Sequence, residues 1–315
     1  MGRLIHRVLF RFSQGLFVAA AVSTLSFILL VMLPGDLALK VAMARYGEDL
    51  ADEQAAAYVR REEGLDRPLW FRYGVWIKDT VTFNLGRSLV TGNSVADDIR
   101  FHFGMTTRLA VCSMILSLFL AAPWGIFAGL RPGSYTDLAS VIVSGCLVSI
   151  PSFVLGAVLI ILFAVKLRWV PAAGFMQASN LILPSMTLAL GLAAVSSRVI
   201  RTATVEVKGS FFITFARLKG LSAYRVFYAH GVRNAAIPVV TFLGLQLAHL
   251  LDGIVVLENL FDWPGIGNLL IQAIVARDLP IIQGTTLVIG LMYVTVNAVT
   301  DMICLWLDPR QGTGK

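Results

Sequence analysis

Long apolar stretches constrain the fold of this 315-residue chain more than any other feature. A transmembrane helix needs about 20 mainly apolar residues, because lipid offers no partners for backbone hydrogen bonds. Six stretches meet that requirement: Leu9–Leu33, Met105–Leu130, Leu138–Val165, Leu181–Val199, Ile237–Leu257 and Ile281–Leu307. Charged residues make up only 14% of the chain, whereas soluble domains carry about a quarter. The sequence therefore predicts an all-α integral membrane protein with six transmembrane helices.

Basic residues predict the orientation of these helices, because Lys and Arg concentrate in short cytoplasmic loops. Arg3, Arg7 and Arg11 at the first stretch place the N-terminus in the cytoplasm, and an even number of helices returns the C-terminus there. The connection between the fourth and fifth stretches is also strongly basic and is expected in the cytoplasm. Its basic residues are Arg198, Arg201, Lys208, Arg217, Lys219, Arg225 and Arg233.

The chain between the first two stretches, residues 34–104, is expected to form a helical extracytoplasmic segment. Gln54–Glu63 has the composition of a short polar helix that ends at Gly64. An amphipathic helix with two Trp residues follows, which suits a membrane–water interface. Its apolar residues are Leu65, Leu69, Trp70, Tyr73, Trp76 and Ile77. We expect two regions: the N-terminal helix with this segment, residues 1–104, and a five-helix core, residues 105–315.

A second extracytoplasmic loop, Asp262–Gly267, joins the fifth and sixth stretches. Pro264, Gly265 and Gly267 predict a tight re-entrant turn, after which a short apolar helix begins. The apolar residues of that helix are Ile266, Leu269, Leu270 and Ile274. This loop could form an outer gate, bind a partner protein or pack as a lid on the other helices.

The sequence contains no motif for catalysis. Gly314-Lys315 lacks the earlier Gly and the following Ser or Thr of a P-loop. HExxH, GxSxG and clusters of Cys and His with metal-ligand spacing are also missing from the sequence. The three cysteines lie within apolar stretches, where packing is their expected role. We therefore predict no catalytic residue, no metal site and no cofactor on this chain.

The cytoplasmic loop at about 202–234 is the most informative segment. Phe211, Phe215 and Leu218 share one helix face, and Gly220 is suited to end that helix in a left-handed conformation. Ser222 can cap a second short helix. Two interpretations fit the resulting apolar edge. It binds in a groove of a soluble partner, or it rests on anionic lipid headgroups.

Within this loop, Phe215–Ser222, His230–Asn234 and Pro238 closely resemble the coupling-loop signature of ABC importer permeases. The resemblance is to the dipeptide/oligopeptide/nickel branch of that family, and it extends along most of the chain. Its other motifs are Leu33–Asp36, Gly64–Leu69, Leu85–Ser88, Ile150–Gly156, Trp169–Pro171, Glu258–Phe261, Trp263–Gly267, Arg277–Pro280 and Leu307–Arg310. Each motif is weak by itself, but their order and spacing together make the resemblance strong.

The resemblance implies that the chain is the permease subunit of an ATP-driven importer in a bacterial inner membrane. It would form the translocation path with a second, homologous permease. Two cytoplasmic ATPase subunits would bind ATP and Mg²⁺, and an extracytoplasmic binding protein would deliver the substrate. The residues expected at the ATPase contact are Ala216, Arg217, Lys219, Gly220 and Leu221.

Di- and oligopeptides are the expected substrates, with nickel chelates, opines and glutathione as alternatives in the same family. A proton-coupled secondary transporter is the alternative from another class, with His249, Asp252 and Asp301 as its relay. Inverted repeats with broken helices would mark such a carrier, and the sequence has none that we recognise. A membrane-embedded enzyme would need facing catalytic groups at one depth, and none is evident.

Ionisable residues within the predicted spans are candidates for the translocation path, because charges in lipid are unfavourable. His249 and Asp252 are three residues apart and share a helix face. They could meet the substrate or form a structural polar pair between helices. Asp301 lies near the inner end of the sixth span, where a structural role is again the alternative. Gly125 and Gly129 predict close approach of two helices and no chemistry.

Overall fold

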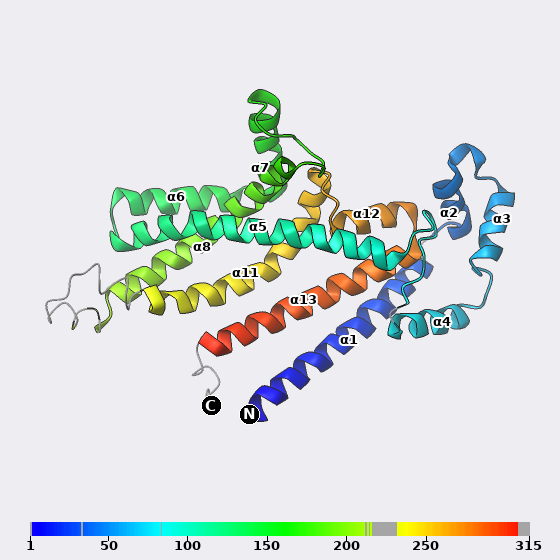
Figure 1. Cartoon of the computed structure of the whole chain (residues 1–315), viewed down its shortest axis with the longest axis horizontal. Coiled ribbons are helices and arrows are strands. Elements are labelled where there is room, and N and C mark those ends of the chain that lie inside the picture. Colours follow the sequence, from blue (N-terminus) through cyan, green and yellow to red (C-terminus); the bar gives the residue numbers. More distant parts are fainter. Residues whose placement is uncertain are drawn as a thin grey trace. The chain divides into compact units, whose positions relative to one another are not determined.

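The computed structural model describes residues 2–32, 34–82, 84–211, 213, 215 and 232–307. Side chains in these ranges are described except at 2–10, 12, 30, 48, 232–234, 237, 248, 249, 252 and 304–307. This part of the chain is mostly helical and contains no β-strand (Figure 1), which confirms the all-α prediction. Backbone contacts divide the chain into two compact units, residues 1–106 with 264–295 and residues 107–263 with 296–315.

The first unit combines two long apolar helices with several short ones. It contains α1 (Gly2–Met32), α2 (Leu37–Tyr46), η1 (Glu48–Leu50), α3 (Glu53–Glu62), α4 (Leu69–Val81), the start of α5 (Val95–Leu130), α12 (Ile266–Ala276) and the first part of α13 (Leu279–Leu307). α2 packs against α3 through buried Val41 and Val59. The start of α5 packs against α12 and α13 around Val95 and Ile281.

Local sequence explains where the short helices begin and end. The Asp52 carboxylate accepts a hydrogen bond from the Ala55 N–H at 2.7 Å and caps α3. Gly64, with φ +60°, provides the left-handed residue after that helix, so the predicted short polar helix is confirmed. α4 confirms the amphipathic helix. It begins at Leu69, because Pro68 precedes it, and so excludes Leu65.

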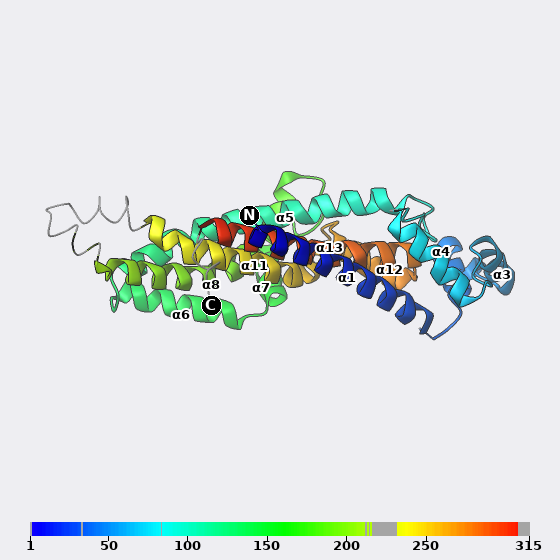
Figure 2. The same cartoon turned by 90° about the horizontal axis from the view of Figure 1, so that it is seen from below.

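In the second unit, α8 (Ile182–Lys208) is the central helix. The unit also contains the rest of α5, α6 (Tyr135–Ser149), α7 (Ser152–Leu159), the π-helix η2 (Ile160–Lys166), η3 (Ala178–Leu181), α11 (Val232–Leu260) and the end of α13. α8 lies between α6 and α11 (Figures 1 and 2). Its contact with α5 and α11 is apolar, with Ala121, Ala193 and Ile200 buried there.

Gly125 and Gly129 allow α5 and α8 to approach closely, as the sequence predicts. A Cβ atom at Gly125 would lie 2.6 Å from the carbonyl oxygen of Ser197. A Cβ atom at Gly129 would lie 2.8 Å from the carbonyl oxygen of Arg201. Neither distance is compatible with a real side chain, so only glycine fits these two positions without a shift of the backbone.

The third apolar stretch, Leu138–Val165, is not one continuous helix as expected. It is broken between α6 and α7, and the two parts of the stretch are bent by 100° (Figure 1). Pro151 explains the break, because proline lacks a backbone N–H and disfavours helical backbone at the preceding residue. Ile150 is accordingly extended, with φ −91° and ψ 121°.

The turn before α12 is present, but its unusual backbone lies at a different residue from the one expected. Asp262 is left-handed, with φ 48°, whereas Gly265 has φ −93° and Gly267 lies within α12. Asp tolerates this conformation better than most residues. The Trp263 N–H donates to the Glu258 carbonyl at 2.8 Å and closes the turn. The predicted short apolar helix is confirmed as α12.

Three helices in the described part of the chain are long and apolar enough to cross a membrane. They are Val95–Leu130, Ala178–Lys208 and Leu279–Ile303, and the bent α6–α7 pair would make a fourth. Shorter apolar helical runs cover Ser13–Leu29 and Pro238–Leu247. Large apolar side chains remain exposed on α5, including Phe119 and Phe127, as expected for a surface in lipid. The number of six spans stays a prediction.

Candidate functional site

The five residues expected at the ATPase contact, Ala216, Arg217, Lys219, Gly220 and Leu221, lie outside the described residues. The start of their loop is described at three positions. Phe211 and Phe215 are exposed to 95% and 60%, whereas Ile213 between them is buried. Ile213 packs with Val207 of α8 and with Ala235 of α11. The two Phe side chains therefore lie on the surface, beside a contact that fixes the start of the loop.

An ion pair ties the last turns of α8 to the start of α6. The Arg201 guanidinium donates two hydrogen bonds to the Asp137 carboxylate, at 2.5 Å and 2.7 Å. The same carboxylate accepts the Gly133 N–H at 2.9 Å, and Asp137 is buried. Ser134 caps α6 by accepting from the Asp137 N–H. This bidentate geometry is among the stronger polar contacts in proteins.

Lys208, the last residue of α8, makes a second link. Its ammonium group donates to the Leu130 carbonyl at the end of α5, at 2.6 Å. A lysine at that position satisfies a carbonyl that has no partner within its own helix. We call Leu130, Asp137, Arg201 and Lys208 the loop root, because they join α5 and α6 to the helix that leads into the coupling loop.

Sequence reasoning missed the loop root as a unit. Arg201 and Lys208 were expected only as basic residues of a cytoplasmic loop, and Asp137 was not considered. A signal existed for part of it, since an acidic residue in the first turn of a helix after a Ser cap is favourable. Arg201, the partner in the ion pair, lies 64 residues after Asp137 in the sequence, and no local pattern connects the two residues.

The candidates for the translocation path are only partly described. His249 and Asp252 lie on α11, but their side chains are outside the described residues. Asp301 is exposed near the end of α13. α11 also carries two buried polar residues that sequence reasoning did not propose as site residues. The Gln246 amide bonds with Ser196 at 2.7 Å and with the Leu192 carbonyl at 3.1 Å, and Glu258 is fully buried.

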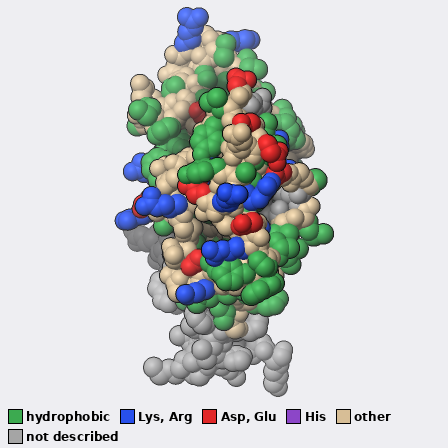
Figure 3. Space-filling model, turned by 90° about the vertical axis from the view of Figure 1, so that its right-hand side faces the viewer, with side chains coloured by type: hydrophobic (Ala, Val, Ile, Leu, Met, Phe, Trp, Pro, Cys, Tyr) green, Lys and Arg blue, Asp and Glu red, His purple; other side chains and the backbone are tan. Residues whose placement is uncertain are grey.

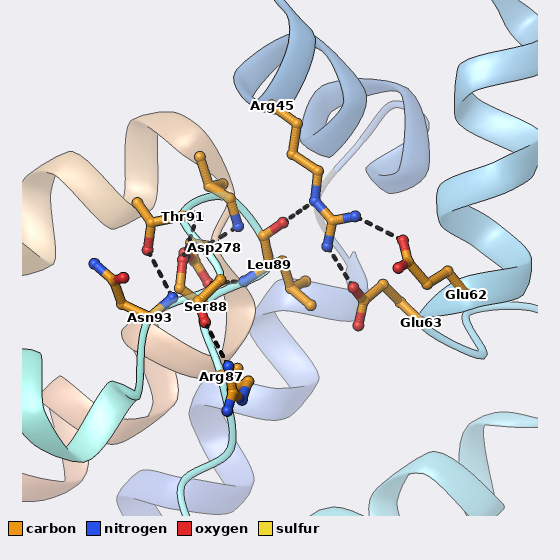
Figure 4. Close-up of polar contacts among 11 residues, drawn as sticks. Arg45, Glu62, Glu63, Arg87, Ser88, Leu89, Thr91, Asn93 and Asp278 are labelled. Carbon is orange, nitrogen blue, oxygen red and sulfur yellow. Dashed lines mark hydrogen bonds and ion pairs between the residues drawn. The ribbon is translucent and has the colours of Figure 1, made fainter.

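A second polar centre, in the first unit, is built on Asp278 between α12 and α13. Its carboxylate accepts hydrogen bonds from the Ser88 hydroxyl and, at 3.1 Å, from the Leu89 N–H (Figure 4). The Ser88 hydroxyl oxygen accepts the Thr91 N–H at 2.8 Å. Asp278 and Ser88 are both buried. We call Asp278, Ser88 and Leu89 the Asp278 hub.

Arg45 extends this hub to α2 and α3. Its guanidinium donates to the Leu89 carbonyl, to Glu62 at 2.8 Å and to Glu63 (Figure 4). Burial lowers the pKa of Arg45, but the hydrogen bonds to Glu63 and Glu62 outweigh this and leave the pKa raised. Figure 3 shows basic and acidic side chains close together on the side of α2, α3 and α4.

Three motifs of the sequence meet in the first unit. Ser88 of the Leu85–Ser88 motif bonds with Asp278 of the Arg277–Pro280 motif. Arg277 donates to the Pro34 carbonyl at 2.8 Å, and Asp36 next to it pairs with Arg60. Residues of these motifs, far apart in the sequence, therefore form contacts that hold this unit together.

No cluster of three or more His, Cys, Asp or Glu side chains that could hold a metal ion occurs in the described residues. The polar centres consist instead of carboxylates matched with guanidinium, N–H or hydroxyl groups. Such an arrangement can hold helices together or pass on a displacement.

Comparison with known proteins assigns this chain to a family. The family described as "Binding-protein-dependent transport system inner membrane component" matches residues 121–313. The glutathione transport system permease protein GsiC of Escherichia coli K12 is 38% identical over 288 residues, which cover 91% of this chain and 92% of that protein. GsiC of Shigella dysenteriae serotype 1 matches with the same identity and coverage.

Proposed function

The chain belongs to the family of binding-protein-dependent transport system inner membrane components, and we propose from this its substrate, its permease partner and its response to ATP. It is the permease subunit of an ABC importer in the inner membrane. It is not an enzyme, because ATP is hydrolysed in separate ATPase subunits. A substrate-binding protein is the other partner that the family requires. Because members of this family are driven by ATP, we do not propose a proton relay through His249, Asp252 and Asp301.

Short peptides are the proposed substrates, a class that includes the tripeptide glutathione. One observation carries this proposal: the chain is 38% identical, over 91% of its length, to permeases named for glutathione transport. Nickel chelates and opines remain alternatives within the same family. The binding protein selects the substrate before it reaches the membrane, so the permease only needs a path that tolerates the class.

A second, homologous permease completes the proposed translocation path. Both termini would lie in the cytoplasm, with the binding protein on the opposite side. Exposed apolar residues on α6, such as Leu138 and Ile142, support a surface that packs in lipid or against another membrane helix. ATP and Mg²⁺ would bind only to the two ATPase subunits.

The loop root supports a specific route for coupling. Closure of the ATPase subunits would move the loop through Ala216, Arg217, Lys219, Gly220 and Leu221. The movement would reach α8, and the Asp137–Arg201 and Lys208–Leu130 contacts would carry it to α6 and α5. His249 and Asp252 on α11 and Asp301 on α13 are the proposed residues of the path.

Uptake by intact cells tests the substrate. A strain without peptide importers would carry this chain with the genes of its partners, and labelled glutathione, a labelled dipeptide and a nickel chelate would be supplied separately. We expect ATP-dependent uptake of the first two, with each competing against the other. Uptake of the nickel chelate that excess peptide does not reduce would contradict the proposal.

A further inference from the structure

A cavity of about 450 Å³ lies in the first unit, between the end of α3, α4, the segment after α4 and the start of α13. Small-molecule sites have volumes of about 300–1,000 Å³. We call it the arginine cavity, because Arg61, Arg67 and Arg72 line it. The amides of Asn84 and Gln283 are further polar groups in its lining. A neighbouring cavity of about 200 Å³ shares Arg72 and Gln283, so Arg72 borders both.

The lining of the arginine cavity and the neighbouring Arg45 together carry one excess positive charge. Glu62 and Glu63 belong to the lining, but both form ion pairs with Arg45. Among the described residues, Asp79 is then the one carboxylate of the lining outside an ion pair. Together with Arg45, the three guanidinium groups of the lining therefore outnumber its three carboxylates by one. An anionic ligand would balance the remaining charge.

Arg72 is the lining residue that most requires an anion. It is half-buried on α4, and no described residue accepts a hydrogen bond from its guanidinium. Burial lowers the pKa of Arg72, because loss of water disfavours the charged form. Arg67 differs, since its guanidinium lies 5.0 Å from the centre of the Phe71 ring. A phosphate group can accept two parallel hydrogen bonds from a guanidinium and would compensate Arg72 for the lost water.

α4 has the features of a helix at a membrane–water interface. Trp70 and Val81 are exposed to 75% and 73%. Tyr73 and Trp76 contact Phe27 of α1, with ring centroids 5.2 Å and 5.8 Å apart. Amphipathic helices with Trp and Tyr lie at the depth of the lipid headgroups. Phospholipid phosphates are abundant at that depth, so the arginine cavity lies where such a ligand is available.

We propose that the arginine cavity binds the phosphodiester of an anionic phospholipid headgroup. Arg72 is the main hydrogen-bond donor, and the acyl chains lie along the exposed apolar residues of α4. The negative charge of the bound lipid balances the one excess positive charge, and the lipid holds α4 against α1. Inorganic phosphate offers the same pair of phosphate oxygens as the lipid headgroup. The test therefore distinguishes the phospholipid from free phosphate.

Native mass spectrometry of the importer complex tests this proposal. The complex, purified in neutral detergent, is titrated with dioctanoyl phosphatidylglycerol, and the bound lipid is counted. Arg72→Gln should weaken binding about tenfold, because it removes a charge-assisted bidentate contact. Arg72→Lys keeps the positive charge but lacks the two parallel N–H donors of the guanidinium, and it should give an intermediate affinity for the lipid. Lys78→Gln is the matched control, since it removes a charge from α4 at an exposed residue outside the lining.

Weaker lipid binding by Arg72→Gln alone, with no displacement by excess inorganic phosphate or glutathione, supports the proposal. Equal lipid binding by the Arg72→Gln and Lys78→Gln proteins would overturn it. Displacement of the lipid by inorganic phosphate would assign the cavity to the free anion. Displacement by glutathione would assign it to a peptide substrate, and either result also overturns the lipid proposal.

Discussion

At the scale of single residues, buried carboxylates explain how distant parts of each unit are joined. Asp137 is only 5% exposed and depends on Arg201 for its charge balance. Asp278 is 3% exposed, and within the described part of the chain its carboxylate accepts from the Ser88 hydroxyl and the Leu89 N–H. A buried carboxylate that loses its partners keeps its desolvation penalty, so variants of the partners measure how much each contact matters.

Replacement of Arg201 tests the loop root. Arg201→Gln should lower the free energy of unfolding by about 2 kcal/mol, because it leaves the Asp137 carboxylate without its guanidinium in a site that solvent still screens partly. Thermal unfolding of the purified protein measures the change. Arg198→Gln, on the exposed side of the same helix, is the control and should have little effect. The Asp137→Asn/Arg201→Gln double variant should be no less stable than Arg201→Gln, and additive losses would show that the two residues act independently.

Replacement of Asp278 tests the Asp278 hub. Asp278→Ala removes the acceptor for Ser88 and Leu89 and should destabilise the first unit by about 3 kcal/mol. We expect faster proteolytic cleavage between residues 84 and 94. The exposed Asp66→Ala is the control. Equal cleavage rates for these two variants and the unchanged protein would mean that the hub does not hold this segment.

At the scale of elements, the contact between α5 and α8 depends on two glycines. Gly125→Ala should destabilise the protein by about 1–3 kcal/mol, because the new Cβ atom lies 2.6 Å from a backbone oxygen and the helices must separate. Gly145 of α6 has open space around it, so Gly145→Ala should instead be neutral or stabilise the helix by about 1 kcal/mol. The thermal unfolding temperatures of the Gly125→Ala and Gly145→Ala proteins are compared. Stabilisation by Gly125→Ala would rule out close packing of α5 against α8 at this residue.

Sequence patterns predicted those features of the elements that depend on neighbouring residues. The spacing of Gly125 and Gly129 predicted their helix contact, and the composition near Gly64 predicted α3. The break at Pro151 was missed, although proline provided a local signal, because the surrounding apolar stretch was long enough for one span. The ion pair of Asp137 and Arg201 had no such signal, since only the fold brings residues of α6 and α8 together.

At the scale of the whole molecule, the proposed coupling to ATP depends on the loop between α8 and α11. Gly220→Val should leave membrane insertion and assembly with the ATPase subunits intact and abolish ATP-driven uptake. The reason is that the loop is expected to need a left-handed residue there, which a β-branched side chain does not adopt without strain. Immunoblotting of membranes and co-purification measure insertion and assembly. Normal uptake by this variant would remove Gly220 from the coupling route.

Transport by the reconstituted complex tests whether this chain imports its substrate with the energy of ATP. Proteoliposomes would contain the permeases and the ATPase subunits, with ATP trapped inside and the binding protein and labelled glutathione outside. We expect uptake that requires both ATP and the binding protein and that is unchanged by a protonophore. Uptake without ATP that collapses when the protonophore is added would contradict an ATP-driven importer.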